Sequence, residues 1–265
     1  MLLPRLLTAA IGLPVLVALT LIGGVPFAVA LALVLAIATI EFCTAAGYSV
    51  REPEVWLGAT LAAALVPATY GNADLRAAIL SATIMLALLA AVVRADVTPG
   101  PRPAIWLVLP TALLWIGWLG VDLLLVRRLA QGERWFLLLL LGVFATDTGA
   151  YAVGRLFGRH KLAPRVSPAK TIEGAIGGLL FGAGAIVALD YLLGLPHKPI
   201  LIVALGLAVG VAAELGDLAE SVVKRRLGVK DMGHLFPGHG GVLDRLDSLL
   251  FAGAVLYYLV RWAIL

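Results

Sequence analysis

Residues 221–247, SVVKRRLGVKDMGHLFPGHGGVLDRLD, form the most highly charged stretch of a chain that is otherwise almost continuously apolar. An apolar run from Ile200 to Ala213 precedes this stretch, and another apolar run follows it to the end of the chain. Charged side chains are costly inside lipid, and those close to an apolar span usually serve a function. We therefore expect the stretch to lie at one face of a membrane, between two spans.

The composition supports a membrane protein. The chain has 265 residues, of which 62% are hydrophobic and 14% are charged, and its mean hydropathy is +1.02. These values exclude an ordinary soluble domain. The lone Cys43 excludes an intrachain disulfide. The net charge of +4 lies largely in loops, where it should face anionic lipid or an anionic substrate rather than nucleic acid.

Apolar runs recur along the whole chain. A helix needs about 20 apolar residues to cross a bilayer, and on this basis the sequence predicts an all-α, polytopic integral membrane protein with about nine transmembrane helices. We interpret the first run as a span rather than a signal peptide, because another apolar run follows it after two glycines. The predicted spans are 5–22, 26–47, 55–70, 76–94, 104–126, 135–156, 171–193, 200–222 and 246–265.

The Lys and Arg residues predict the orientation. Most of them fall on the side of the N-terminus, so the N-terminus and residues 221–247 should be cytoplasmic and the C-terminus outside. We expect a multi-pass protein of the inner membrane with a cytoplasmic active site. Arg127, Arg128 and Arg134 contradict this topology. Either their loop is an exception or the fifth run is broken.

The ionisable residues divide the chain into two regions. Residues 1–134 contain about five spans with few charges and many small residues, which let helices pack closely in lipid. We expect this region to be a scaffold and a possible homodimer contact. Glu41, a single acid near a span end, could reach the site, but it is interpreted first as a snorkelling or paired group. Residues 135–265 form the predicted catalytic region, with about four helices and two basic cytoplasmic loops.

The eighth span carries four ionisable residues on one face. At about 100° per residue, Glu214, Asp217, Glu220 and Lys224 fall within roughly a third of the helix circumference. The carboxylates lie deeper in the membrane than Lys224, which is nearest the rim. This face could therefore present carboxylates to a ligand at headgroup depth.

A second pair of carboxylates begins the last span. Asp244 and Asp247 share its first turn, where the helix dipole favours negative charge. If the two spans bring their acids together, Asp217 and Asp244 could hold Mg²⁺, which takes few protein ligands and leaves the rest to water and phosphate. The alternative is a structural network in which these acids pair with Lys224 and Arg245.

A second polar segment begins in the sixth span, at FATDTG with Asp147, and ends in the loop 158–174, GRHKLAPRVSPAKTIEG. Ser167 and Thr171 can cap the following helix, with Pro168 in its first turn. Capping does not explain Lys170, a cation at a helix start, unless an anion binds there. The basic residues of the loop lie on the predicted cytoplasmic side and are Arg159, Lys161, Arg165 and Lys170.

Both segments resemble the phosphatidate cytidylyltransferases, the CDP-diacylglycerol synthases, over residues 144–250. The sequence differs from the family pattern at one position, where Ala169 replaces the first lysine of the usual pair. Lys170 must therefore act alone. In the earlier segment the matching residues are Asp147, Thr148, Gly149, Ala150, Tyr151, Gly154, Arg155, Ser167, Pro168, Lys170, Thr171, Glu173 and Gly174. In the later segment they are Ser221, Val223, Lys224, Arg225, Lys230, Asp231, Gly233, Phe236, Pro237, His239, Gly240, Gly241, Asp244, Arg245, Leu246 and Asp247.

The resemblance implies that phosphatidic acid attacks the α-phosphate of CTP, giving CDP-diacylglycerol and pyrophosphate. Its implied cofactor is Mg²⁺ on Asp217 and Asp244, and a second cation is left open. The residues expected to be catalytic are Asp217, Asp244, Lys224, Arg225 and Lys170. The residues expected to bind substrate are Asp147, Lys161, Ser167, Thr171, Ser221, Lys230, His239, Arg245 and Asp247.

Two alternatives remain open at this stage. The first is the same chemistry on another lipid phosphate, such as an ether lipid or an isoprenoid phosphate, because acyl tails are recognised only by apolar surface. The second is an ion-coupled transporter, since intramembrane acids also mark ion pathways. A transporter predicts related halves, whereas here the charge is confined to the second half.

Overall fold

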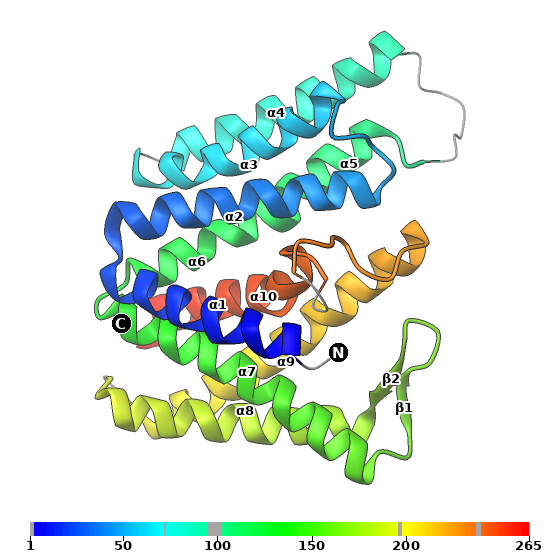
Figure 1. The fold of residues 1–265 in the computed structure, drawn as a ribbon. Coiled ribbons are helices and arrows are strands. Elements are labelled where there is room, and N and C mark those ends of the chain that lie inside the picture. Colours follow the sequence, from blue (N-terminus) through cyan, green and yellow to red (C-terminus); the bar gives the residue numbers. More distant parts are fainter. Residues whose placement is uncertain (1–2, 72, 95–101, 196–197, 237–239, 265) are drawn as a thin grey trace. The chain divides into compact units, whose positions relative to one another are not determined.

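The structure, a computed structural model, describes residues 3–71, 73–94, 102–195, 198–236 and 240–264. Helices form nearly all of the described chain (Figure 1), because in lipid the backbone groups of an apolar run must be satisfied within the segment. The helices are α1 (Leu3–Ile22), α2 (Gly24–Ala45), α3 (Pro53–Gly71), α4 (Ala73–Arg94), α5 (Ile105–Ala112), η1 (Leu113–Trp118), α6 (Leu119–Arg127), α7 (Gly132–Phe157), α8 (Ile172–Leu193), α9 (Pro199–Leu227), α10 (Leu243–Leu259) and η2 (Val260–Ile264).

Each predicted apolar run overlaps one or more of these helices. Within the described ranges, six helical segments are long and apolar enough to cross a membrane. The multi-helical membrane architecture is therefore confirmed, whereas the predicted number of nine spans is not. The six segments are Gly24–Ala45, Ile105–Arg127, Gly132–Phe157, Ile172–Leu193, Pro199–Leu227 and Leu243–Ile264.

The fifth predicted run is continuous. Its helix passes from α5 through the π-helical η1 into α6 and counts as one candidate span. Pro110 lies inside α5, where it removes one backbone donor, and the π-helical turn follows three residues later. A break in this run therefore does not explain why Arg127 and Arg128 lie on the unexpected side of the predicted topology.

A β-hairpin departs from the all-α prediction. Strands β1 (Lys161–Ala163) and β2 (Ser167–Thr171) pair antiparallel, in the segment that the sequence predicts to be a loop. Pro168 within β2 made a strand hard to foresee, because proline lacks a ladder donor and is confined to edge positions. A two-stranded hairpin has only edges, so it tolerates this residue.

The described chain separates into two compact units. The first unit contains Met1–Leu124 and Leu227–Arg245, and the second contains Leu125–Arg226 and Leu246–Leu265. The chain therefore returns to the first unit for the loop after α9 and for the first residues of α10. The functional division predicted at residues 134 and 135 remains a prediction.

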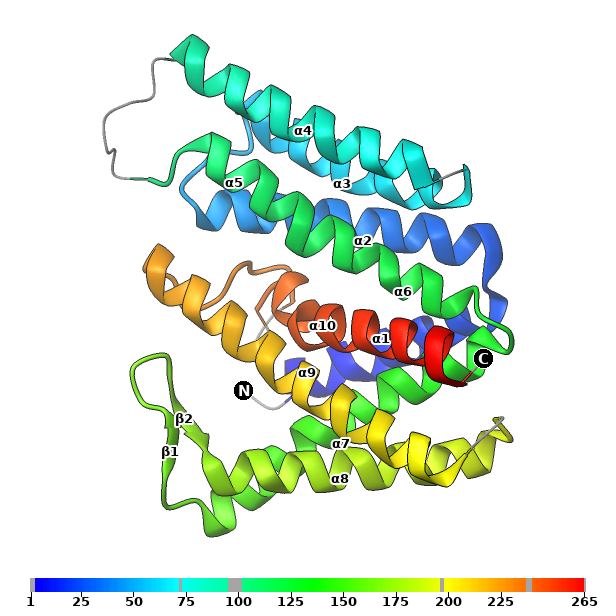
Figure 2. The same ribbon diagram turned by 180° about the vertical axis from the view of Figure 1, so that it is seen from behind.

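In the first unit, α2 packs along α3, and α4 and α5 pack beside them (Figures 1 and 2). Arg102, which precedes α5, ties the loop after α2 to this group. Its guanidinium donates to both carboxylate oxygens of Glu52 at 2.9 and 3.1 Å and lies 4.0 Å from the centre of the Tyr48 ring. This cluster holds together two connections at one end of the helices.

In the second unit, α7 and α8 run side by side, and the hairpin lies at one end of the pair (Figures 1 and 2). Glycines allow the two backbones to approach. A Cβ atom on Gly177 would lie 2.5 Å from Cβ of Val153, and one on Gly178 would lie 2.9 Å from Cβ of Ala150. Small residues therefore let these two helices pack closely.

Replacing Gly177 with Ala should destabilise this helix pair. The added methyl group overlaps the branched side chain of Val153, and overpacking of this kind lowers the free energy of unfolding by about 1–3 kcal/mol. The matched control is Gly184→Ala on the same helix, because a Cβ atom there meets nothing within 4 Å. Thermal unfolding in detergent measures both variants. Equal melting temperatures for the two variants would contradict this packing.

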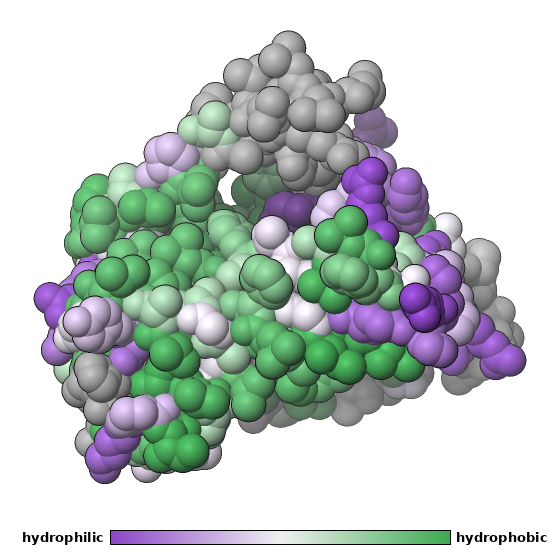
Figure 3. All heavy atoms as spheres, turned by 90° about the horizontal axis from the view of Figure 1, so that it is seen from below, coloured by the Kyte–Doolittle hydropathy of each residue, from purple (hydrophilic) through white to green (hydrophobic). Residues whose placement is uncertain are grey.

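Large apolar side chains are exposed on the second unit, on α8 and α9. Leu180 and Phe181 are 65% and 60% exposed, and Tyr191 and Ile200 are 78% and 76% exposed. Figure 3 shows broad hydrophobic areas on the face that it draws. Exposed apolar surface on this scale is unusual for a soluble monomer and suits contact with lipid.

Candidate functional site

A pocket of about 420 Å³ lies within the second unit. Four elements meet around it: the second half of α7, the hairpin, the first turn of α8 and the later part of α9. Five of the residues predicted from the sequence to bind substrate or catalyse line it, although they come from three separate segments. The lining residues are Asp147, Ala150, Tyr151, Gly154, Arg155, Leu162, Ser167, Ala169, Lys170, Thr171, Gly174, Ala175, Glu214 and Asp217.

Lys170 links the hairpin side of this pocket to α9. It lies near the end of β2, and its Nζ atom is 2.8 Å from Oδ2 of Asp217 on α9. The same Nζ atom lies 3.5 Å from the carbonyl oxygen of Glu214. The Lys170 and Asp217 side chains are 24% and 35% exposed, so the ion pair is reachable from the pocket. The structure therefore brings the hairpin and α9 together at this pocket.

Glu214 contributes a second carboxylate to the pocket, one turn before Asp217. Its Oε1 atom is buried and has no hydrogen-bond partner among the described residues. A Cβ atom on Gly178 would lie 2.8 Å from this oxygen, so the glycine makes room for it. A buried carboxylate oxygen without a donor is suited to a cation or to a donor on a ligand.

Thr171 is the N-cap of α8. Its hydroxyl oxygen accepts a hydrogen bond from the Gly174 amide at 3.1 Å, as predicted. The expectation that Ser167 also caps this helix and that Pro168 lies in its first turn is wrong, because both residues belong to β2. The helix begins later than the sequence suggested, and Ser167 instead lines the pocket.

Glu173 holds the connection between α7 and β1. Its carboxylate accepts hydrogen bonds from the backbone amides of Arg159 at 3.0 Å and His160 at 3.2 Å. It also lies 2.6 Å from Nδ1 of His160. The acid in the first turn of α8 therefore positions the start of the hairpin. Lys161, at the beginning of β1, is exposed and does not belong to the pocket lining.

The C-terminal part of α9 carries three further predicted residues. Ser221 donates from Oγ to Oδ1 of Asp217 at 3.4 Å. Lys224 forms an ion pair with Glu220, with Nζ 2.5 Å from Oε2, and Glu220 is fully buried. Arg225 donates from Nε to the carbonyl oxygen of Val166 at 3.1 Å, which ties α9 to the hairpin turn.

Asp247 lies in α10, close to α9. Its Oδ1 atom accepts the backbone amide of Ser248 at 2.7 Å. A Cβ atom on Gly216 would lie 2.5 Å from the carbonyl oxygen of Asp247, so glycine lets the two helices approach at this level. The predicted role of Asp247 in substrate binding remains a prediction.

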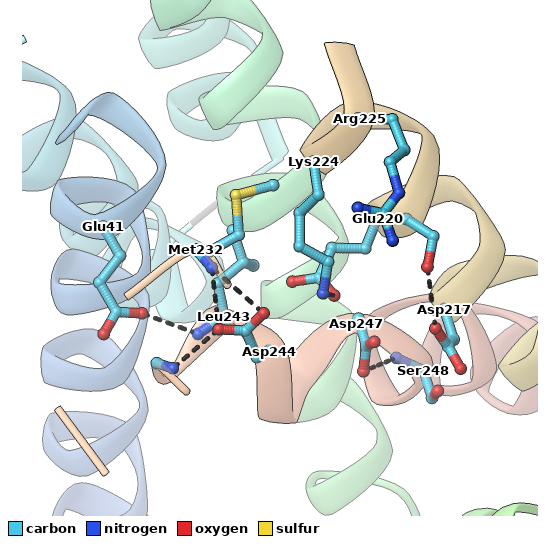
Figure 4. Close-up of polar contacts among 12 residues, drawn as sticks. Glu41, Asp217, Glu220, Lys224, Arg225, Met232, Leu243, Asp244, Asp247 and Ser248 are labelled. Atoms are coloured by element: carbon cyan, nitrogen blue, oxygen red, sulfur yellow. Dashed lines mark hydrogen bonds and ion pairs between the residues drawn. The ribbon is translucent and has the colours of Figure 1, made fainter. Parts of the chain in front are cut away.

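Asp244 is enclosed by backbone donors in the first unit (Figure 4). Its two carboxylate oxygens lie 3.2 and 3.0 Å from the Met232 amide nitrogen, and Oδ2 accepts the Gly241 amide at 2.7 Å. The residue is only 7% exposed. The carboxylate therefore closes the loop before α10 onto the first turn of that helix.

Glu41 also belongs to this cluster, which the sequence did not predict. It is 8% exposed and accepts the Leu243 amide at 3.0 Å, 202 residues away along the chain. Of the two interpretations, snorkelling is wrong and pairing is correct. The only available signal was an acid within an apolar run. Lys230 and Arg245 are exposed in the same part of the chain, and His239 lies outside the described residues.

Asp217 belongs to the second unit and Asp244 to the first, so the metal site that would join them remains a prediction. In the described part of the chain, no group of three or more His, Cys, Asp or Glu side chains is arranged to hold a metal ion. Asp217 pairs with Lys170, and Lys224 pairs with Glu220; neither pair is one that the alternative structural network proposed.

A family model described as the cytidylyltransferase family matches residues 3–263. The match extends well beyond residues 144–250, to which the motif resemblance was confined. It therefore also covers the helices that the sequence assigned only to a scaffold.

Three curated relatives carry the name phosphatidate cytidylyltransferase. The protein from Staphylococcus epidermidis is 44% identical over 131 residues, covering 49% of this chain and 50% of the relative. The protein from Mycobacterium bovis is 46% identical over 121 residues, covering 45% and 39%. The protein from Staphylococcus aureus is 43% identical over 131 residues, covering 49% and 50%. The matched part thus spans half or less of each relative.

Proposed function

The chain belongs to the cytidylyltransferase family, and from this premise we propose that it transfers CMP from CTP to phosphatidic acid, giving CDP-diacylglycerol and pyrophosphate. The observation that carries the proposal is the pocket in which Lys170 and Asp217, from two motif-bearing segments, form an ion pair. The printed name of the three relatives indicates the same substrates.

The reaction needs charge neutralisation more than proton transfer. An oxygen of the lipid phosphate forms a bond to the α-phosphorus of CTP, and the bond from that phosphorus to the bridging oxygen breaks, so that pyrophosphate leaves with the electron pair. The attacking phosphate is already ionised at pH 7, so no general base is required. Two polyanions must be held together, which is a task for fixed cations and precise positioning.

Lys170, Lys224 and Arg225 are the cations assigned to this task. Lys170 lies in β2, and Lys224 and Arg225 lie in the last turn of α9, where Arg225 contacts the hairpin turn. Lys170 and Lys224 are paired with Asp217 and Glu220. Binding of a triphosphate would give these lysines new anionic partners, and it would release carboxylate oxygens into the pocket.

Mg²⁺ is the proposed cofactor, with the possibility of a second cation left open by the sequence. The residues fit a divalent ion at Asp217, because Glu214 brings to the same pocket a buried carboxylate oxygen that has no hydrogen-bond partner within the described ranges. Asp244 is the second proposed ligand, although its oxygens already accept two backbone amides. Mg²⁺ would supply charge stabilisation at phosphate oxygens.

The site should face the cytoplasm, where CTP is present, and the protein should lie in the inner membrane of a bacterium with its N-terminus inside. A homodimer contact through the first helices remains part of the proposal. A cysteine introduced at exposed Arg159 in the hairpin connection should react with a membrane-impermeant thiol reagent only from the cytoplasmic side. Labelling only from the outside would show that the orientation is opposite to the one proposed.

Purified protein with CTP, Mg²⁺ and phosphatidic acid tests the function directly. Formation of pyrophosphate and CDP-lipid in equal amounts is the expected result. Parallel reactions with an isoprenoid phosphate or an ether-lipid phosphate distinguish the lipid substrates. Absence of CTP turnover with every lipid phosphate would overturn the proposal, and solute flux into proteoliposomes without CTP would favour a transporter.

Replacing Lys170 with Ala should weaken the use of CTP. The variant removes one cation from the pocket and takes from Asp217 its 2.8 Å partner. We expect KM for CTP to rise at least tenfold, which corresponds to about 1.4 kcal/mol, with KM for the lipid nearly unchanged. The control is Lys198→Ala, an exposed lysine before α9. If steady-state kinetics show an unchanged KM for CTP, the role of Lys170 is structural only.

A further inference from the structure

Glu41 links the N-terminal half of the chain to the signature motif. It lies in the last turns of α2, and its Oε2 atom accepts the backbone amide of Leu243, the first residue of α10 (Figure 4). The first amides of a helix lack intrahelical acceptors, and here an acid from a distant helix satisfies one of them. The contact also places negative charge at a helix N-terminus, where it is favourable.

Two glycines of the loop before α10 leave room for the carboxylate of Glu41. A Cβ atom on Gly233 or on Gly241 would overlap the carboxyl group of Glu41. Neither glycine has the positive φ that would by itself require glycine. Their lack of a side chain is therefore explained by the close approach of Glu41, and not by backbone conformation.

The carboxylate of Asp244 also accepts hydrogen bonds from this loop. It accepts the amides of Met232 and Gly241, while Glu41 accepts the amide of Leu243. Both acids are nearly fully buried, and buried carboxylates persist only where donors surround them. Together they hold the loop and the helix start in one arrangement, with Glu41 supplying the only contact of this set that comes from α2.

We propose that Glu41 is a positioning residue for the cytidylyltransferase reaction: through the Leu243 amide and the space left by Gly233 and Gly241 it holds the loop before α10, and so orients Asp244. This inference rests on the proposed function. It assigns to the N-terminal region a part in the chemistry, since α2 determines where a motif residue of the last helix points. Glu41 itself touches no substrate.

The experiment compares Glu41→Ala and Glu41→Gln in the full-length protein in detergent or nanodiscs. Gln keeps an oxygen that can accept the Leu243 amide, whereas Ala does not. The matched control is Thr39→Val on the same helix, which is fully buried but donates only within its own helix, to the Leu35 carbonyl oxygen at 2.8 Å. Each variant is assayed for kcat, for KM of CTP, for melting temperature and for amide hydrogen exchange of the peptides that contain Met232 and Leu243.

For Glu41→Ala we expect exchange in these peptides to increase roughly tenfold or more, as expected for loss of a hydrogen bond to a charged group. We expect kcat to fall by a similar factor, with KM for CTP changed less than about twofold. Glu41→Gln should restore most of both quantities, and Thr39→Val should match the wild type. Wild-type exchange and wild-type kcat in Glu41→Ala would overturn the inference, and so would failure of Gln to rescue either quantity.

A double-mutant cycle covers the case in which Glu41→Ala does not accumulate as folded protein. Gly233→Ala should lower kcat in the wild-type background, because its methyl group overlaps the Glu41 carboxyl group. In the Glu41→Asp background, where the side chain is shorter, Gly233→Ala should lower kcat clearly less. Residues in contact show such non-additivity. Strictly additive effects would contradict the contact.

The two proposals fail in different ways. If the wild-type protein does not turn over CTP, the proposed function is wrong, while the exchange rates and the melting temperatures still report the Glu41 contact. If the wild type is active and Glu41→Ala keeps its kcat, only the positioning role is wrong.

Discussion

Replacing Asp217 with Asn is expected to reduce CDP-lipid formation to less than about a tenth of the wild-type rate, because loss of a group that binds a catalytic cation removes several kcal/mol of charge stabilisation. Asn preserves the size and one oxygen of the side chain but not its charge. In the pocket, Asp217 is the carboxylate that faces Lys170 at 2.8 Å, and the variant therefore also removes the partner that keeps this lysine in place.

The measurement is pyrophosphate release over a range of Mg²⁺ concentrations. If Asp217 binds the cation, the residual activity of Asp217→Asn should require more Mg²⁺ than the wild type does, and the melting temperature should change little. The matched control is Glu133→Gln, which removes a partly exposed carboxylate charge from the first turn of α7. The pocket is lined by the other half of this helix. Retention of more than about a tenth of the rate would exclude Asp217 from the metal site.

Replacing Asp244 with Asn should cause a comparable loss of turnover, together with a loosening of the loop before α10. The carboxylate accepts the Met232 and Gly241 amides through its two oxygens. Asn retains one acceptor but turns its amide group, a donor, toward one of these backbone donors. A buried N–H group that loses its partner costs about 1–3 kcal/mol, and the loop should open more often.

The two aspartate variants should therefore differ in one observable. Asp244→Asn should raise amide hydrogen exchange in the peptides that contain Met232 and Gly241, whereas Asp217→Asn should leave these peptides unchanged. The same peptides in the Thr39→Val protein serve as the reference. Asp244→Asn with an intact loop and full turnover would remove Asp244 from both the proposed metal site and the anchoring of the loop.

Lys170 and Asp217 could each be singled out from the sequence because each residue stood out locally, although their pairing was not predicted. Lys170 lies at a helix start, where a cation is unfavourable without an anion, and Asp217 lies on a charged helix face inside an apolar run. Glu214 was placed on that face by helical periodicity, but its role in the pocket was not foreseen. Periodicity shows which residues share a face and not which face lines a cavity.

The hairpin and the contacts of Glu41 could not be predicted in this way. Residues 161–171 contain two prolines and several charges, so no alternation of apolar and polar residues indicates a strand. Glu41 and Leu243 are 202 residues apart, and no local pattern links a carboxylate on one helix to the amide at the start of another. Of the two predicted N-caps of α8, only Thr171 is the cap for a related reason, since Ser167 lies in β2.

The amino-acid sequence alone was sufficient to identify a helical membrane protein, the segments that carry its chemistry and the family to which they belong, because hydropathy and motif spacing are properties of local sequence. Tertiary structure alone decided the partner of each charged group: Lys170 for Asp217, backbone amides for Asp244 and a distant helix start for Glu41. A buried carboxylate needs donors from whatever lies beside it, and only the packing of the helices determines what that is.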